Sequence, residues 1–268
     1  MRKAPALDGM PDFHDSLEWL RHRHHLSRES AAQQAGFSSS YLHRLIRDRT
    51  YPGPRVFAKL VDAFDLDSSQ RRHLHELWQP SLDLPPAEEL RQRLTGLGIQ
   101  AHLDHLDTRD TLAVYLDPLR TVLHGNRIFH RMAPGLAEAD NNYFQWMFSP
   151  AARDHIHDWD NEARYTVTIL RGTLGRYRDL PRARSVFRKL RATPEFPRVW
   201  ESTPMQVTYD RPRPTPIHVR TPGTDQPVSL SLEIGDYGEC PDVLLAYGLY
   251  GTPAIAAENA TLEHDRTR

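Results

Sequence analysis

Hydrophobic residues in the first third of the chain recur at three- and four-residue steps, which indicates short amphipathic helices. Leu17 and Leu20 share one face of a helix that begins near Phe13 and ends near His25. Further apolar sets with helical spacing lie within residues 39–46, 56–64 and 74–78. Residues 13–79 are therefore predicted to form a compact unit of five short helices.

The boundaries between these helices carry residues that start or stop helices. Ser27 and Ser38 stand at expected N-caps, because a serine oxygen can accept a hydrogen bond from the first helical turn. Gly36 stands between them, where a chain that leaves a helix needs a positive φ. A short alanine-rich helix over 28–34, a tight glycine turn and a second helix from Ser39 form a predicted helix-turn-helix.

The second helix of such a motif lies in the major groove, and its N-terminal residues contact bases. We expect Arg44 to bind guanine, and Ser39 and Ser40 to donate or accept hydrogen bonds. From Arg44 to Lys59 the chain holds five basic residues against one acidic residue, as phosphate binding requires. The alternative is a helical bundle with a solvated arginine face. The full set of predicted DNA contacts is Arg28, Ser38, Ser39, Ser40, His43, Arg44 and Arg49.

Two segments carry a family resemblance. Residues 26–38, with the sequence LSRESAAQQAGFS, resemble the signature of the XRE (Cro/phage-repressor-like) helix-turn-helix family. Residues 39–46, SSYLHRLI, resemble the recognition helix of that family. The resemblance implies that Ser39, Ser40 and Arg44 read bases and that Arg28 contacts a phosphate.

From Leu112 the pattern changes to short β-like runs on both sides of a long helical segment. A turn at 117–120 joins the first two runs. This order predicts an α+β domain in which helices cover one face of an antiparallel sheet. Strands are predicted over 112–116, 121–124, 205–210, 217–220, 228–234 and 243–250, and helices over 143–148, 158–177, 182–190 and 194–200.

Prolines at positions 80, 85 and 86 separate the two parts of the chain. The predicted organisation is therefore a two-domain α+β protein, with an all-α helix-turn-helix domain at 1–80 and a second domain at 110–257. A linker or connecting helix is expected over 81–109. The polar residues 258–268 are expected to be a disordered tail.

The order of elements in the second domain is the PAS arrangement, and residues 110–251, joined to an XRE domain, resemble the MmyB-like family of bacterial transcription regulators. This family often has a histidine three residues after its tryptophan, where this chain has Thr203. The resemblance implies a sensor domain with an apolar cavity, for which fatty-acid-like ligands have been proposed. The matching segments are 114–117 (VYLD), 122–126 (VLHGN), 142–148 (NYFQWMF) with Arg153 and Trp159, and 196–200 (FPRVW).

Two groups of side chains are candidates for such a pocket, which is typically apolar with a few polar anchors. The alternative is that the aromatic residues form core and the asparagines cap helices. The candidate lining is Phe129, Met132, Phe144, Trp146, Met147, Phe148 and Ile169, and the candidate anchors are Asn126, Arg127, Asn142 and Arg153.

Composition narrows the class of protein. The 268 residues are 39% hydrophobic, which excludes wholesale disorder. Cys240 is the only cysteine, which excludes an internal disulfide framework. The chain has no apolar run of membrane-spanning length and no secretory signal at its start, so we expect a cytoplasmic protein. The net charge of -1 is a sum over the whole chain, in which the basic segment 44–59 is offset by acidic residues elsewhere. It therefore does not exclude nucleic-acid binding.

Patterns for catalysis and metal binding are missing from the sequence. His22, His24 and His25 cluster, but no His-Glu-x-x-His occurs and no carboxylate stands at the needed offset. No Gly-x-Ser-x-Gly elbow and no phosphate-binding Gly-Lys-Ser/Thr loop is present. We therefore expect no enzymatic activity, no cofactor and no metal site.

These observations predict a sequence-specific transcription regulator. It would bind a double-stranded DNA operator as a homodimer and respond to a small apolar, fatty-acid-like ligand. The alternative is a protein-interaction module with a degenerate helix-turn-helix and a PAS-like dimerisation domain. A steep salt dependence of DNA affinity distinguishes a DNA reader from that module.

Overall fold

The computed structural model describes residues 9–209, 211, 216–220 and 227–251. The described chain divides into two compact units. The first unit runs to Asp83 and also includes Val167–Tyr209, and the second unit holds Leu84–Thr166 and the described residues from Arg211 onward. The predicted tail at 258–268 lies outside the described residues.

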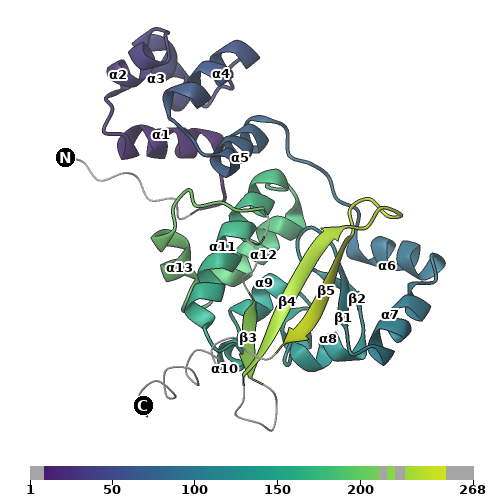
Figure 1. Ribbon diagram of the computed structural model, residues 1–268. Coiled ribbons are helices and arrows are strands. Elements are labelled where there is room, and N and C mark those ends of the chain that lie inside the picture. Colours follow the sequence, from purple (N-terminus) through teal and green to yellow (C-terminus); the bar gives the residue numbers. More distant parts are fainter. Residues whose placement is uncertain (1–8, 210, 212–215, 221–226, 252–268) are drawn as a thin grey trace, which may run out of the picture. The chain divides into compact units, whose positions relative to one another are not determined.

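The first unit opens with five helices, which confirms the prediction for its N-terminal part (Figure 1). Asp12, Ser27, Ser38 and Asp67 each cap a helix by accepting hydrogen bonds from its first turn. The helices are α1 (Phe13–Arg23), α2 (Arg28–Gln34), α3 (Ser39–Arg47), α4 (Pro54–Ala63) and α5 (Ser68–Trp78).

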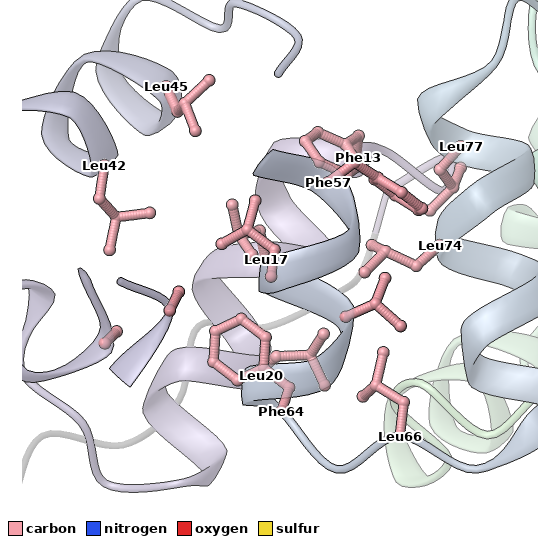
Figure 2. Close-up of a cluster of buried hydrophobic side chains, with 14 of the residues drawn as sticks. Phe13, Leu17, Leu20, Leu42, Leu45, Phe57, Phe64, Leu66, Leu74 and Leu77 are labelled. Atoms are coloured by element: carbon pink, nitrogen blue, oxygen red, sulfur yellow. The ribbon is translucent and has the colours of Figure 1, made fainter. Parts of the chain in front are cut away.

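The apolar faces of these helices meet in one core (Figure 2). The sequence spacing of their apolar residues places leucine and phenylalanine side chains toward this shared interior. Met205, far along the sequence, is also fully buried in the same cluster. Core residues drawn in Figure 2 include Phe13, Leu17, Leu20, Leu42, Leu45, Phe57, Phe64, Leu66, Leu74 and Leu77.

The later part of the first unit comprises the end of α11 (Trp159–Arg176), then α12 (Pro181–Arg191) and α13 (Phe196–Ser202). The strand predicted over 205–210 is wrong for its described residues, 205–209, which form no strand. The alternating apolar residues there suit a strand, but no strand among the described residues pairs with them. The amide of Thr208 instead donates to the carbonyl of Thr168 in α11, at 3.3 Å.

The second unit is built on a five-stranded antiparallel sheet in the order β2-β1-β5-β4-β3. The remaining predicted strands are confirmed, with shifts of one or two residues at most ends. The helices of this unit include α8 (Arg127–Met132), α9 (Tyr143–Met147), α10 (Pro150–His155) and the start of α11. The strands are β1 (Leu112–Leu116), β2 (Val122–Gly125), β3 (Ile217–Arg220), β4 (Pro227–Asp236) and β5 (Leu244–Gly251).

Two helices, α6 (Ala87–Gly96) and α7 (Ile99–Thr108), stand where the sequence predicts a linker or connecting helix (Figure 1). Their buried leucines, such as Leu90 and Leu103, pack with Tyr115 of β1. Strand β1 is buried along its whole length, so helices and neighbouring residues cover it on both faces. The sequence predicts helices on one face of the sheet only. At β1 this prediction is wrong, because α6 and α7 form an additional helical layer against this strand.

Candidate functional site

The helix-turn-helix consists of α2, a glycine turn and α3. Gly36 has φ +71°, a left-handed conformation that glycine adopts without steric cost. Ala31 and Ala32 are buried on α2, where their small side chains allow α3 to approach closely. Ser38 then caps α3 by accepting a hydrogen bond from the amide of Tyr41, at 3.3 Å.

Helix α3 separates sharply into a buried face and an exposed face. Leu42 and Leu45 are buried in the core of the first unit. The predicted base-reading residues are all exposed on the other positions of the helix: Ser39, Ser40, His43 and Arg44. Because the leucines fix α3 in the core, the opposite face is held in a defined orientation.

Arg28 and His43 join the two helices of the motif. The Arg28 Nη1 donates to Nδ1 of His43 at 3.2 Å, and its Nη2 donates to Glu18 at 3.2 Å. Burial raises the pKa of Glu18, but Arg21 and Arg28 outweigh it and hold that pKa below its usual value. The guanidinium of Arg28 is therefore oriented by a carboxylate of α1 and placed beside the candidate reading face.

Arg49 has a different environment from the other predicted DNA contacts. Its guanidinium pairs with Asp12 at 2.6 Å and with Asp15 at 3.0 Å. Asp12 also caps α1, and its pKa is lowered by hydrogen bonding and by the charge of Arg49, against the opposing effect of burial. Arg49 thus ties the start of α1 to the chain after α3, and its DNA contact stays a prediction.

The other cations near α3 differ in how they are held. Arg47 pairs with Asp48 at 2.7 Å, while the Arg44 guanidinium lies over the Tyr41 ring, 5.5 Å from its centre. Arg55 is exposed and has no ion pair within the described part of the chain. Arg44 and Arg55 are therefore the arginines of this region that are not neutralised by a described carboxylate.

The two candidate anchor asparagines of the second unit hold its backbone together. Asn126 Oδ1 accepts from the amides of Phe129 and Ala113, and its Nδ2 donates to the carbonyl of Thr111. In the same way, Asn142 Oδ1 accepts from the amide of Gln145, and its Nδ2 donates to the carbonyl of Leu119. These contacts favour the alternative that the asparagines cap helices, and ligand binding by them stays a prediction.

The remaining predicted ligand contacts divide into buried and exposed residues. Phe144, Met147 and Phe148 are buried, as the aromatic segment predicts for either core or pocket lining. Arg127 is exposed, and Arg153 is exposed with its guanidinium 5.1 Å from the centre of the Trp159 ring. The other candidate lining residues Phe129, Met132 and Trp146 are buried, and Ile169 is half-buried.

The sequence does not reveal Arg120, which lies in the turn between β1 and β2. Its Nη1 is buried and has no hydrogen-bond partner among the described residues. Burial lowers the pKa of the guanidinium, against the smaller opposing effects of Tyr143, Asp117 and Tyr165. A buried cationic donor without a partner is uncommon, since such groups are normally hydrogen-bonded. The turn pattern around position 120 gave no signal of this burial, which depends on residues distant in sequence.

The described residues contain neither a metal-binding cluster nor a membrane-spanning helix. No group of three or more histidine, cysteine, aspartate or glutamate side chains there could hold a metal ion. None of the described helices has both the length and the apolarity that crossing a membrane requires.

Comparison with known families identifies both parts of the chain. Residues 15–74 match a helix-turn-helix domain, and residues 97–232 match the MmyB-like transcription regulator ligand binding domain. A helix-turn-helix joined to such a domain defines a transcription regulator with DNA-binding and ligand-binding parts, which are regulatory rather than enzymatic domains. The second match spans half of the chain, and the protein therefore belongs to the MmyB-like transcription regulators. Curated proteins give no significant match.

Both family predictions made from the sequence are confirmed at this level. The narrower assignments to the XRE class and to the PAS arrangement stay predictions.

Proposed function

We propose that the protein is a sequence-specific transcription regulator that binds a palindromic operator as a homodimer. The observation that carries this proposal is the division of α3, whose leucines anchor it while Ser39, Ser40, His43 and Arg44 are exposed together. Such a helix presents hydrogen-bonding groups that suit base edges in the major groove.

Each cation near α3 has a distinct proposed role. Arg44 donates two hydrogen bonds to guanine, and Arg28 binds a phosphate while it orients His43. Arg55, exposed at the start of α4, also binds a phosphate. Arg44 therefore determines the preference for particular bases, whereas Arg55 contributes binding affinity that does not depend on the DNA sequence.

The homodimer follows from the size of the reading element. Helix α3 has nine residues, and one such helix reads a half-site only. A two-fold dimer matches two half-sites that lie one helical turn of DNA apart, about 34 Å.

Selection of bound fragments from a random DNA pool by the full-length protein tests this proposal. We expect an enriched inverted repeat, with a binding affinity that falls steeply between about 50 and 200 mM salt. A pool without enrichment, together with salt-independent residual binding, would instead support the protein-interaction module.

For the second unit, we propose a small apolar ligand with an acidic head group, of the fatty-acid type. Support comes from Arg120, because its buried Nη1 is a charged donor that a carboxylate would satisfy. The buried aromatic segment around Phe144 and Met147 supplies apolar surface within the same unit.

Native mass spectrometry with decanoic acid and 1-decanol distinguishes an acid-binding site from a merely apolar one. The wild-type protein should retain the acid in preference to the alcohol, and Arg120→Leu should remove this preference. Arg127→Leu is the matched control, because Arg127 is an exposed arginine of the same unit. Equal retention of acid and alcohol by the wild-type protein would contradict the acidic head group.

A further inference from the structure

Three side chains from three helices form a hydrogen-bonded network that ends on the exposed face of α3. Nη2 of Arg28, in α2, donates to Glu18 of α1 at 3.2 Å, and Nη1 of Arg28 donates to Nδ1 of His43 in α3 at 3.2 Å. Helices α1, α2 and α3 share one apolar core, which fixes their backbones relative to one another (Figure 1). The Glu18–Arg28–His43 network therefore connects a carboxylate of α1 to a predicted base contact.

The network has a fixed end and an accessible end. The Glu18 side chain is 17% exposed, and it also accepts hydrogen bonds from Nε and Nη2 of Arg21. The Arg28 side chain is 39% exposed, and His43 is exposed. Because a hydrogen bond between two charged groups is stronger than one to a neutral ring, Glu18 sets the orientation of the Arg28 guanidinium. Arg28 in turn sets the orientation of the His43 ring.

The donor in this network determines the tautomer of His43. A guanidinium group has five N–H donors and no acceptor. Nδ1 of His43 therefore accepts the hydrogen bond from Arg28, which requires that Nδ1 carry no proton. A neutral imidazole has a single N–H, so Nε2 holds the proton and is a donor. The ring is thus held as the neutral Nε2–H tautomer.

The Nε2–H group is the part of His43 that is left for DNA. The two nitrogens of an imidazole point to different sides of the ring, so Nε2–H points away from Arg28 when Nδ1 faces it. In the major groove, a donor matches purine N7, guanine O6 or thymine O4. It does not match the amino groups of cytosine and adenine, which are donors themselves.

We propose, on the basis of the proposed DNA-reading role of α3, that His43 donates from Nε2 to an acceptor atom of one base. Arg28 is the positioning residue that selects this tautomer, and Glu18 orients Arg28. Without Arg28, the His43 proton exchanges between the two ring nitrogens, and Nε2 then also accepts from base amino groups. The network therefore gives His43 a single direction of hydrogen bonding and narrows the set of bases that fit at its position.

Binding of the full-length protein to modified operators tests this direction. Each base of the selected half-site is replaced singly by an analogue that lacks one acceptor: a 7-deazapurine for N7, 2-aminopurine for guanine O6, or 5-methyl-2-pyrimidinone for thymine O4. At one position the loss of the acceptor should weaken wild-type binding about fivefold. His43→Ala should abolish this penalty and leave the penalties at other positions unchanged.

Two arginine variants separate positioning from phosphate binding. Arg28→Met should weaken binding to every probe, through its lost phosphate contact, and should also reduce the penalty at the His43 position. Arg55→Ala is the matched control, because it removes a proposed phosphate contact that does not touch His43. It should weaken binding to all probes equally and retain the full penalty. A full penalty in Arg28→Met would overturn the positioning role.

NMR of the DNA-free protein tests the network without an operator. Proton–nitrogen correlation spectra of the histidine rings at pH 7.5 show which ring nitrogen holds the proton. We expect Nε2–H alone for His43 in the wild-type protein and a mixture of tautomers in Arg28→Met. A proton on Nδ1 in the wild-type protein, or identical His43 signals in both proteins, would overturn the network.

The outcomes distinguish this inference from the proposed function on which it rests. A random pool without an enriched operator would contradict DNA reading, and the base contact of His43 with it. An enriched operator whose acceptor penalties all persist in His43→Ala would overturn the His43 contact and leave the proposed function intact. A His43-dependent penalty for loss of an amino group, at cytosine N4 or adenine N6, would mean that Nε2 accepts, which contradicts the proposed tautomer.

Discussion

Gly175 of α11 packs directly against His73 of α5: a Cβ built at position 175 would lie 2.6 Å from Cε1 of the imidazole. This contact is part of a longer junction between α5 and the segment 167–209. Tyr209 Oη donates to Glu76 at 2.6 Å, and Arg178 donates to the carbonyls of Glu76 and Gly175. The last of the five N-terminal helices, α5, is therefore supported by residues one hundred or more positions further along the chain.

Gly175→Ala should destabilise the protein by about 1–3 kcal/mol, because the added methyl group overlaps the rigid imidazole of His73. Chemical denaturation measures the change in the free energy of unfolding. Gly96→Ala is the control, since a Cβ at position 96, the last residue of α6, meets no atom within 4 Å. The control should be neutral or slightly stabilising, through its higher helix propensity. Equal losses in both variants would contradict a specific contact.

Protein stability should fall as the pH decreases from about 6.5 toward 3, partly through His73. Burial and two arginine charges hold its folded-state pKa near 3, whereas the unfolded chain titrates at the ordinary value of 6.5. Between these two pKa values the unfolded state binds a proton at His73 that the folded state does not. The free energy of unfolding therefore falls by up to about 1.4 kcal/mol for each pH unit of acidification. In His73→Leu the free energy of unfolding should depend less steeply on pH. His75→Leu, at an exposed position of the same helix, serves as the control, and a slope unchanged by His73→Leu would refute this assignment.

Arg44→Ala should weaken operator binding by about 1–3 kcal/mol and relax preference at one base pair. Arg55→Ala should instead weaken binding to all sequences similarly and reduce the slope of log affinity against log salt concentration by about one. Fluorescence anisotropy on the selected operator and its single-base variants measures both effects. A uniform loss with Arg44→Ala would mean that this residue contacts the backbone rather than a base.

Arg49→Ala should lower the free energy of unfolding by about 1 kcal/mol, because it removes two partly exposed ion pairs that hold the start of α1. Arg55→Ala, which has no described ion pair, should leave stability unchanged. Thermal unfolding of both variants at low and high salt measures this difference. Undiminished stability of Arg49→Ala would contradict this structural role, and an accompanying loss of DNA affinity would support Arg49 as a DNA contact.

The helices of the first unit could be predicted closely because the signals for them are local. Ser27, Gly36 and Ser38 act within a few residues of themselves, and they limit α2 and α3 at the predicted positions. The exposed face of α3 followed from the same spacing that buried Leu42 and Leu45. The predicted helix-turn-helix and the resemblance to the MmyB-like family are confirmed, whereas the XRE assignment stays a prediction.

The contacts of site residues that local patterns do not predict depend largely on distant partners. Asn126 is a predicted ligand anchor, which stays a prediction, and the structure adds hydrogen bonds of its amide group to Thr111, Ala113 and Phe129. Arg120 looked like a turn residue, and the burial of its guanidinium follows from how the second unit packs around that turn. The hydrogen bonds of Asn126 and the burial of Arg120 are properties of the folded unit, and no local pattern encodes them.

The sequence by itself determined where most helices and strands begin, which face of α3 is exposed, and that a helix-turn-helix precedes a domain of the MmyB-like family. Capping, periodicity and glycine turns act over a few residues, so they can be read along the chain. Only the tertiary structure decided that Met205 enters the helix-turn-helix core, that Arg49 holds α1, and that His73 packs against Gly175. Each of these depends on side chains brought together across long stretches of sequence, where packing and desolvation, rather than local propensity, set the outcome.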